Sequence, residues 1–565
     1  MTRNRTATIL VLALFLTMVN SFRLFPQSGT SSAMAGSVTD KSGAMIPNAQ
    51  VKASEVNTGA VRTIQSNADG RYLFSQVNPG TYRIEVHAEG FGPGQSQPTS
   101  VAVGQTVTVN FTLSPAASEQ TVEVTGQSAL MSLENPNTST TIEAETIKSL
   151  PNPGQDLTYV AQFAPGALMN TAGSSNDAKA AGGYGNVEFN GLPATSNGYI
   201  LDGFDANDPF LGLNIGLSTN LVIGLDALQE ATVNTNSYAV DLGRYGASQV
   251  NYFTKSGSNR FHGDLYEIWN GSLLNGTDYF LHVNDTPGNI AKKPRSTVNE
   301  FGVSVGGPIL KDKLFFFSHY EGIRIALPLV ARTTVPTPVF QQYVLNQLKT
   351  QQVGTDWINC TVVPGSNPVQ YNCPHLDAQS DEFAFYQNMF ALYSNTAGTP
   401  TAVLTCPYDE SGALIQGTES PTNLFDGKGC ANIRTQSMNN SDSENLIVVK
   451  IDHTINANNS VWYRFQQDTG LQAAYTDPIN PIFNAYSPQP QRTLVLGYTR
   501  VLTSNVVNQF NPGVSWYSSL FLPNNYAQVL NTFPIVLSGG SSNAPFTTVG
   551  GNDQTYTQGR KVTQW

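Results

Sequence analysis

Segments of about ten residues with period-two alternation follow one another after Phe261, and they constrain the fold more than any other feature. Residues 299–321, 446–465 and 493–516 each read as strand, turn and strand. The first apolar run, at 9–19, is shorter than the roughly 20 residues of a membrane-spanning helix, and no later run approaches that length. Antiparallel strands closed into a barrel satisfy every backbone group in lipid without such a run. The pattern therefore predicts a transmembrane antiparallel β-barrel in residues 260–565.

Composition narrows the functional classes. Charged residues make up 12% of the chain, aromatic residues 10%, and the net charge is -11. Nucleic-acid binding needs clustered Lys and Arg, which this chain lacks, so we expect no nucleic-acid partner. The six histidines have no metal-ligand or catalytic spacing, and we expect no cofactor.

The first residues have the form of an export signal. Arg3 and Arg5 precede the apolar run, and small residues at Ala33 and Ala35 fit a cleavage site, with a site nearer Gly29 also open. A buried N-terminal helix is the alternative interpretation. We expect a signal peptide over approximately 1–30.

Residues 35–114 read as a small β-sandwich. Tyr82, Ile84 and Val86 alternate with polar residues, as in a strand with one buried face, and turn clusters separate such runs. A linker follows at 115–127, where 119–126 offers a short alternating strand. Residues 128–259 then mix short strands, turns and a short helix near Asp156, which predicts an α+β domain. The predicted fold class is mainly β.

Several motifs give the chain a family resemblance. They include Gln229 and Glu230, LGRYG at 242–246, TKSGSN at 254–259, and FGVSVGGP at 301–308. These closely resemble the plug-to-barrel junction and first strands of TonB-dependent outer-membrane receptors. The resemblance is to the Oar-like group, because GSVTDKSGAMIPNAQV at 36–51 and DGRY at 69–72 resemble its N-terminal carboxypeptidase-regulatory-like domain. The peptidase chemistry of that name belongs to another domain, so we expect a spacer or a partner-binding module.

The resemblance implies roles for particular residues. Residues 128–259 would form the plug, with 255–259 as the hinge before a first barrel strand at Phe261. The plug signature maps to Asn190, Gly191, Asp202 and Gly203, with Asn190 where the family often has Arg. A candidate TonB box, the strand that pairs with a TonB-like energy-transducing partner, maps to Glu119, Thr121, Val122, Glu123, Val124 and Thr125. The alternative is that this strand continues the front sandwich or starts the plug sheet.

The long polar segment 333–441 is predicted to be an outer loop, because bacterial barrels have short inner turns and long outer loops. It is our candidate for contact with an unidentified extracellular ligand: a carbohydrate, a peptide or a siderophore-like molecule. The chain's four cysteines, Cys360, Cys373, Cys406 and Cys430, lie in it. Two disulfides are expected in an exported chain, with three pairings open, whereas their spacing does not favour zinc.

Two other motifs carry alternative readings. Asp202, Asp205 and Asp208 have a spacing that could converge on a cation, but the calcium-loop pattern is absent and Asp is common in turns. Ser304 lies in a G-x-S-x-G match, but within flat alternation rather than the strand, turn and helix of a nucleophile elbow. We therefore expect neither a metal nor an enzyme.

By resemblance the leading hypothesis is a TonB-dependent receptor in the bacterial outer membrane that takes up a ligand. The alternative is a surface adhesion or ligand-binding protein that uses the barrel only as an anchor in the lipid bilayer. Barrels of the resembled type have about 22 strands, more than the residues after 259 can form. We expect an N-terminal part of a longer receptor, with an unfinished barrel.

Overall fold

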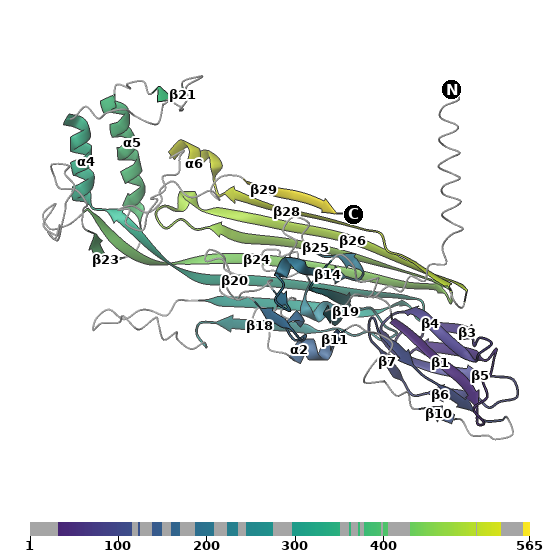
Figure 1. Ribbon diagram of the computed structural model, residues 1–565. Coiled ribbons are helices and arrows are strands. Elements are labelled where there is room, and N and C mark those ends of the chain that lie inside the picture. Colours follow the sequence, from purple (N-terminus) through teal and green to yellow (C-terminus); the bar gives the residue numbers. More distant parts are fainter. Residues whose placement is uncertain are drawn as a thin grey trace, which may run out of the picture.

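The computed structural model describes residues 32–115, 122–124, 138–149, 160–169, 187–207, 223–235, 245–274, 296–350, 361–362, 371–372, 378–396, 399–404, 430–503, 506–532 and 558–564. A small β domain lies at one end of a large sheet of long strands, and helices α4 and α5 lie at the other end (Figure 1). A middle domain packs against the large sheet between them. The expected signal peptide at 1–30 lies outside the described residues.

The front module, residues 32–115, is a sandwich of two sheets. One sheet contains β1 (Ser32–Asp40), β4 (Arg71–Val77), β8 (Thr106–Thr108) and β9 (Phe111–Leu113). The other has the order β10 (Val122–Val124), β6 (Gly94–Ser96), β5 (Gly80–His87), β2 (Gln50–Glu55) and β3 (Val61–Gln65), with β7 (Thr99–Val101) also on β5. The alternating apolar side chains form the core, among them Met34, Phe74, Ile84 and Phe111.

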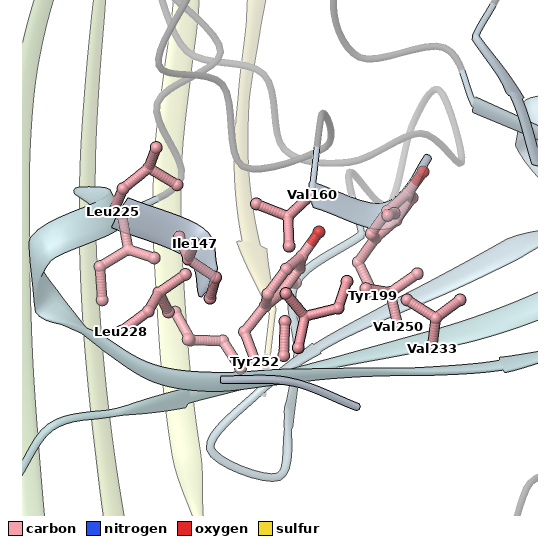
Figure 2. Close-up of a cluster of buried hydrophobic side chains, with 14 of the residues drawn as sticks. Ile147, Val160, Tyr199, Leu225, Leu228, Val233, Val250 and Tyr252 are labelled. Atoms are coloured by element: carbon pink, nitrogen blue, oxygen red, sulfur yellow. The ribbon is translucent and has the colours of Figure 1, made fainter. Parts of the chain in front are cut away.

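The middle domain is built on a five-stranded sheet with the order β11 (Thr138–Glu143), β16 (Leu228–Thr235), β17 (Ser248–Thr254), β14 (Asn197–Leu201) and β15 (Phe204–Asp205). Helix α2 (Ala144–Ser149) and the 3-10 turn η2 (Leu225–Ala227) pack beside it. Figure 2 shows the buried side chains gathered on one face of this sheet, including Ile147, Tyr199 and Tyr252. The small strands β12 (Ala167–Met169) and β13 (Val187–Phe189) pair separately, and the 3-10 turn η1 (Ala194–Ser196) precedes β14.

The large sheet consists of antiparallel neighbours in nearly sequential order. Its path is β18 (Leu265–Gly271), β19 (Thr297–Leu310), β20 (Leu314–Pro336), β24 (Ala431–Asn456), β25 (Asn459–Tyr475), β26 (Ala485–Thr503), β28 (Gly513–Pro523) and β29 (Gln558–Gln564). Two shorter strands, β23 (Thr399–Leu404) and β27 (Val506–Phe510), pair with β24 and β26. The three expected hairpins are all present, and the strands that the structure describes form an open sheet from β18 to β29.

The faces of this sheet are polar inside and apolar outside. On β19, Glu300 and Ser304 are buried toward the middle domain, whereas Val303 and Val305 are 43% and 42% exposed. On β26, Gln491 and Thr493 are buried while Leu494 and Leu496 are exposed. A water-soluble sheet would have the opposite arrangement, and this one is the pattern of strands with lipid on the outer face. Within the described ranges, no helix combines the length and hydrophobicity needed to cross a bilayer.

Two predicted boundaries in the barrel region were wrong. Strands β20 and β24 have 23 and 26 residues and stay paired up to Pro336 and Ala431, so both ends of the predicted loop 333–441 are strand. Residues 431–441 are mostly polar and resemble a loop in sequence, but antiparallel pairing with β20 satisfies their backbone groups. At the first strand, continuous pairing begins at Leu265 rather than Phe261, after one isolated bridge from His262 to Gly306.

Helices lie between and beside the long strands at the end of the sheet away from the front module, which we call the outer end (Figure 1). Between β20 and β24 are α4 (Pro338–Thr350), α5 (Ala378–Leu392), the 3-10 turn η5 (Tyr393–Asn395) and the small pair β21 (Thr361–Val362) and β22 (Tyr371–Asn372). Later in the chain come η7 (Pro481–Phe483) and α6 (Tyr526–Thr532). They share one apolar cluster with the strand ends, containing Val335, Phe390, Tyr393, Phe483 and Val529. The outer end is therefore a folded structure rather than a plain loop.

Candidate functional site

A tight turn anchors the middle domain to the wall of the large sheet. Asp202 and Gly203 join β14 to β15 with φ of 49° and 82°, the left-handed values of a two-residue hairpin turn. The Asp202 carboxylate accepts hydrogen bonds from the Thr254 amide and hydroxyl, at 2.9 and 2.8 Å. It also pairs with Arg464 of β25, whose Nε lies 3.1 Å from Asp202 Oδ2. Arg464 is 1% exposed, so this ion pair is buried between the two domains.

A second contact holds the end of the middle-domain sheet. Lys450 of β24 is buried and donates a hydrogen bond from Nζ to the Thr254 carbonyl, at 3.2 Å. Arg464 likewise donates from Nη2 to the Leu201 carbonyl, at 3.3 Å. Apolar residues of the wall, including Phe317 and Val448, belong to the same core cluster as the middle domain. The domain is thus packed and hydrogen-bonded onto the inner face of the sheet.

A cluster of two lysines and two aspartates lies where the middle domain meets the first strand. Lys148 Nζ of α2 is 2.8 Å from both Asp226 Oδ1 and Asp264 Oδ2, and Lys255 Nζ is 2.9 Å from Asp226 Oδ1. Burial alone would raise the pKa of Asp226, but hydrogen bonds from Lys148, Ser304 and Lys255 hold that pKa well below its ordinary value. The cluster therefore connects α2, η2, the hinge at 255–259 and the start of the first barrel strand.

Glu230 connects the middle domain to the front module. It lies on β16, is 5% exposed, and accepts a hydrogen bond from the Val103 amide at 2.5 Å. Burial raises the pKa of Glu230 to about 7, and the nearby Glu143 carboxylate adds to that rise, while the Val103 hydrogen bond opposes it. Glu143 is the register partner of Glu230 across the β11 and β16 ladder. Part of the recognised Gln229 and Glu230 motif is therefore an interdomain contact.

The candidate partner-binding strand lies on the front module. Val122, Glu123 and Val124 form β10, which pairs in parallel with Gly94, Gln95 and Ser96 of β6. This is the alternative in which the segment continues the front sandwich. Glu119, Thr121 and Thr125 lie outside the described residues, as does the expected helix start near Asp156. The use of β10 by a partner stays a prediction.

The other predicted positions have local structural roles. Asn190 and Gly191 form a left-handed turn, with φ of 53° and 78°, that returns Phe189 to bridge Leu192. Asp205 accepts a hydrogen bond from the Asn207 amide at 2.9 Å. Ser304 accepts one from the Asp264 amide within the strand pairing, at 3.2 Å. Asp208 lies outside the described residues, and those that are described contain no group of three or more metal-ligating side chains.

The outer end holds one described cysteine. Cys430 is buried, lies next to β24, and is disulfide-bonded. It packs against Val339, Phe340 and Tyr343 of α4. Cys360, Cys373 and Cys406 lie outside the described residues, so the pairing stays open.

Comparison with known proteins assigns the chain to a family. Residues 253–565, more than half of its length, match the family described as Outer membrane beta barrel domain. The chain belongs to this outer-membrane β-barrel family. Residues 33–114 of the same outer-membrane protein match the Carboxypeptidase regulatory-like domain. The polar inner face and exposed apolar face of the long strands agree with this assignment.

The outer-membrane barrel chain is also similar to a curated relative. Over 355 residues it is 28% identical to the TonB-dependent transporter Oar of Myxococcus xanthus, covering 60% of this chain and 30% of that protein. The chain thus spans less than a third of the relative's length. Among solved structures, the outer membrane transporter YddB of Escherichia coli matches 70% of this chain and 41% of its own, with 10% identity and a TM-score of 0.40. The siderophore receptor PirA of Acinetobacter baumannii matches 68% and 48%, with 12% identity and a TM-score of 0.29.

Sequence reasoning missed the residues that join the domains. Arg464 and Lys450 are polar positions of alternating strands, and no pattern near them in the sequence predicts Asp202 or Thr254 as their partners. Lys148 was an ordinary charge on a short helix. The one available signal was a basic side chain on the inward face of a barrel strand, because a charge buried there needs a partner.

Proposed function

We propose that this protein is an outer-membrane receptor that takes up a ligand through the barrel when an inner-membrane partner of the TonB type moves the plug. The observation that carries the proposal is the packing of the middle domain, residues 138–254 as described, on the polar inner face of the long strands. Buried polar groups, including the Asp202 and Arg464 ion pair, connect the two. A protein that used its barrel only as an anchor would need no such packed insert.

The position of β11 supports the route by which movement would reach the plug. It is an edge strand of the five-stranded sheet, bonded only to β16 among the described strands, and the chain before it leads to the segment 119–126. A pull on that segment would load β11 first, since every other strand of the sheet lies farther along the chain. The ligand would be captured at the outer end, where α4, α5 and α6 lie around the strand ends.

The test follows plug movement and requires no knowledge of the ligand. Ile142 of β11 is 4% exposed, so an Ile142→Cys thiol should react with a membrane-impermeant maleimide only when β11 leaves the sheet. In energised cells we expect labelling that a protonophore abolishes and that deletion of 119–126 also abolishes. A matched Tyr526→Cys variant, at a residue of α6 that is 47% exposed, should be labelled to the same extent with and without either treatment.

The competing outcome has a clear signature. An adhesion protein anchored by the same barrel would show Ile142→Cys labelling that is low and unchanged by the protonophore. Labelling that depends on energy but survives deletion of 119–126 would reject this segment as the partner-binding strand and leave the transport proposal standing.

A further inference from the structure

A cluster of buried titratable side chains lies on the inner face of β18, β19 and β20. It contains Tyr266, Glu300, His319 and Glu321. His319 and Glu321 are completely buried, and Glu300 is 4% exposed. The Tyr266 hydroxyl donates to Glu321 Oε2, and His319 Nε2 lies 3.3 Å from the same oxygen. The two carboxylates therefore face the interior of the barrel rather than lipid.

A glycine of the barrel wall gives this cluster its room. Gly302 is the register partner of both Tyr266 on β18 and Glu321 on β20. A Cβ on Gly302 would collide with the Tyr266 ring, so the ring crosses β19 at this glycine and reaches Glu321. The first glycine of the G-x-S-x-G match therefore has a packing role.

The plug places a second glycine against the same cluster. Gly224 directly precedes η2 and has φ of -58° and ψ of 138°, which are extended values that any residue adopts. A Cβ on Gly224 would nevertheless collide with Glu321 Oε2 and with His319 Nε2. Glycine is therefore needed here for close approach to the cluster and not for backbone freedom. The Ala227 amide, which donates to the Gly224 carbonyl at 2.9 Å, belongs to the same turn.

The cluster contains more acid than base. Glu300 is opposite Ile323, two residues from Glu321, so the two glutamates are diagonal neighbours on one face, about 7–8 Å apart. In the described part of the chain neither glutamate pairs with a lysine or an arginine, and the ion pair of Glu321 is with His319. Glu321 Oε1 and His319 Nδ1 are buried and have no hydrogen-bond partner. Even with His319 protonated, one of two ionised glutamates would have no opposite charge, which is costly in a buried site.

The neighbouring charges do not neutralise the two glutamates. On β24, Glu444 lies diagonal to Glu321 and adds a further acid, whereas Lys450 lies diagonal to His319 and is bonded to the Thr254 carbonyl. The charged groups nearby on α2, η2, the hinge and β18 are two lysines and two aspartates, which pair with one another: Lys148, Lys255, Asp226 and Asp264. Among these groups, three lysines therefore accompany five carboxylates, counting the two glutamates of the cluster.

We propose that Glu300, Glu321 and His319 form a proton-binding site that holds the plug on the barrel wall. The turn at Gly224 rests on this site while the two carboxylates share a proton, and it lifts away when that proton is lost. Ionisation of both carboxylates requires water, and the turn occupies the space from which water would reach Glu321. The seated turn thus binds the proton more tightly than the lifted turn does, so this attachment is strong at low pH and weakens as pH rises. The inference needs neither a ligand nor an energy-transducing partner.

Infrared spectroscopy of the full chain in detergent tests the shared proton directly. A protonated carboxyl group has a C=O stretching band that an ionised carboxylate lacks. At pH 8 we expect wild type to show such a band and Glu300→Gln to lose it, whichever of the two carboxyl groups carries the proton. Glu267→Gln, at an exposed glutamate of β18, is the matched control and should keep the band. A wild-type spectrum without any band that depends on Glu300 would overturn the proposal, because both carboxylates would then be ionised.

Hydrogen exchange at the Ala227 amide tests whether the proton holds the turn. Glu300→Gln keeps a neutral side chain of the same shape, so its turn should stay seated at every pH. At pH 9 we expect exchange about fivefold or more faster in wild type than in Glu300→Gln, and at pH 6 equal rates within about twofold. Comparison at one pH removes the intrinsic pH dependence of exchange, and effects of Lys255 are common to both proteins. Equal rates at pH 9 would overturn the proposal.

A second pair of variants tests the contact itself. Gly224→Ala adds a methyl group that collides with the cluster, and it should speed exchange at Ala227 at both pH values. Gly246→Ala is the matched control, because its added Cβ meets no atom within 4 Å. If the two variants exchanged alike at Ala227, the turn would not rest on the cluster, and the proposal would fail. The infrared comparison of wild type with Glu300→Gln stands even if Gly224→Ala does not fold.

Discussion

Replacing Glu230 by Gln should stabilise the plug sheet at neutral pH. The carboxylate is buried between β16 and the front module and faces Glu143 across the ladder. Gln keeps an oxygen that can accept the hydrogen bond from Val103 and removes the charge. The substitution therefore tests the cost of a buried carboxylate at this interface, with little change of shape.

The size and the pH dependence follow from the pKa of Glu230. Folding raises it from an ordinary 4.5 to about 7, so the folded state binds the proton more tightly than the unfolded state does. Stability therefore falls as pH rises from about 4.5 to about 7 and is constant above that range. The rise corresponds to about 3 kcal/mol, which Glu230→Gln should recover above pH 7. Below pH 4.5 both side chains are neutral, and the gain should vanish.

Hydrogen exchange of the β11 and β16 amides in the full chain measures this local stability, after correction for the intrinsic pH dependence of exchange. We expect slower exchange in Glu230→Gln at pH 8 and little difference at pH 4. The control Glu143→Gln removes only the facing charge and should give a smaller gain with the same sign. An equal gain at both pH values, or no gain at pH 8, would refute the assignment of the cost to the buried charge.

Three further predictions concern the contacts between domains. Asp202→Ala should destabilise plug packing by about 3–5 kcal/mol, because it leaves Arg464 buried without its carboxylate, and the double variant with Arg464→Ala should cost less than the two single changes added together; protease sensitivity of the plug measures both. Asn259→Ala should speed hydrogen exchange at Asp312, whose amide donates to Asn259 Oδ1 at 2.9 Å, by about fivefold or more, whereas the turn at 457–458 stays unchanged. Lys148→Met should speed energised labelling of Ile142→Cys, since one tie on α2 is lost; unchanged labelling would show that the lysine does not hold the moving element.

The sequence predicted the parts of the fold that depend on residues close together in the chain. Alternation in the front module and in residues 446–465 identified strands because the two faces of each strand lie in different surroundings. The turns at Asn190 and at Asp202 were marked by an Asn-Gly and an Asp-Gly pair, which suit left-handed backbone. The extent of β24 was not predictable in the same way, since residues 431–441 are mostly polar and carry no alternating apolar face.

The site was less predictable because its contacts join residues far apart in the chain. Asp202 was identified as a turn residue, and its ion pair is with Arg464, 262 residues later. Such a pair leaves no periodic signal in a single sequence. Glu230 was identified only as part of a motif, and its contact with Val103 depends on where the front module lies.

The distribution of these contacts bears on which part of the plug can move. Asp202 and Thr254, at the β14 and β17 side of the sheet, are bonded to Arg464 and Lys450 of the barrel wall. Strand β11 is held by its ladder with β16, by the burial of Ile142 in the core and by the Lys148 ties of the helix that follows it. Separating Arg464 from Asp202 would leave an uncompensated buried charge, which costs more than breaking the contacts of the partly exposed Lys148 side chain. A pull that arrives from residue 126 therefore meets the weaker attachment first, and β11 with α2 can leave the sheet while β14 to β17 stay fixed to the wall.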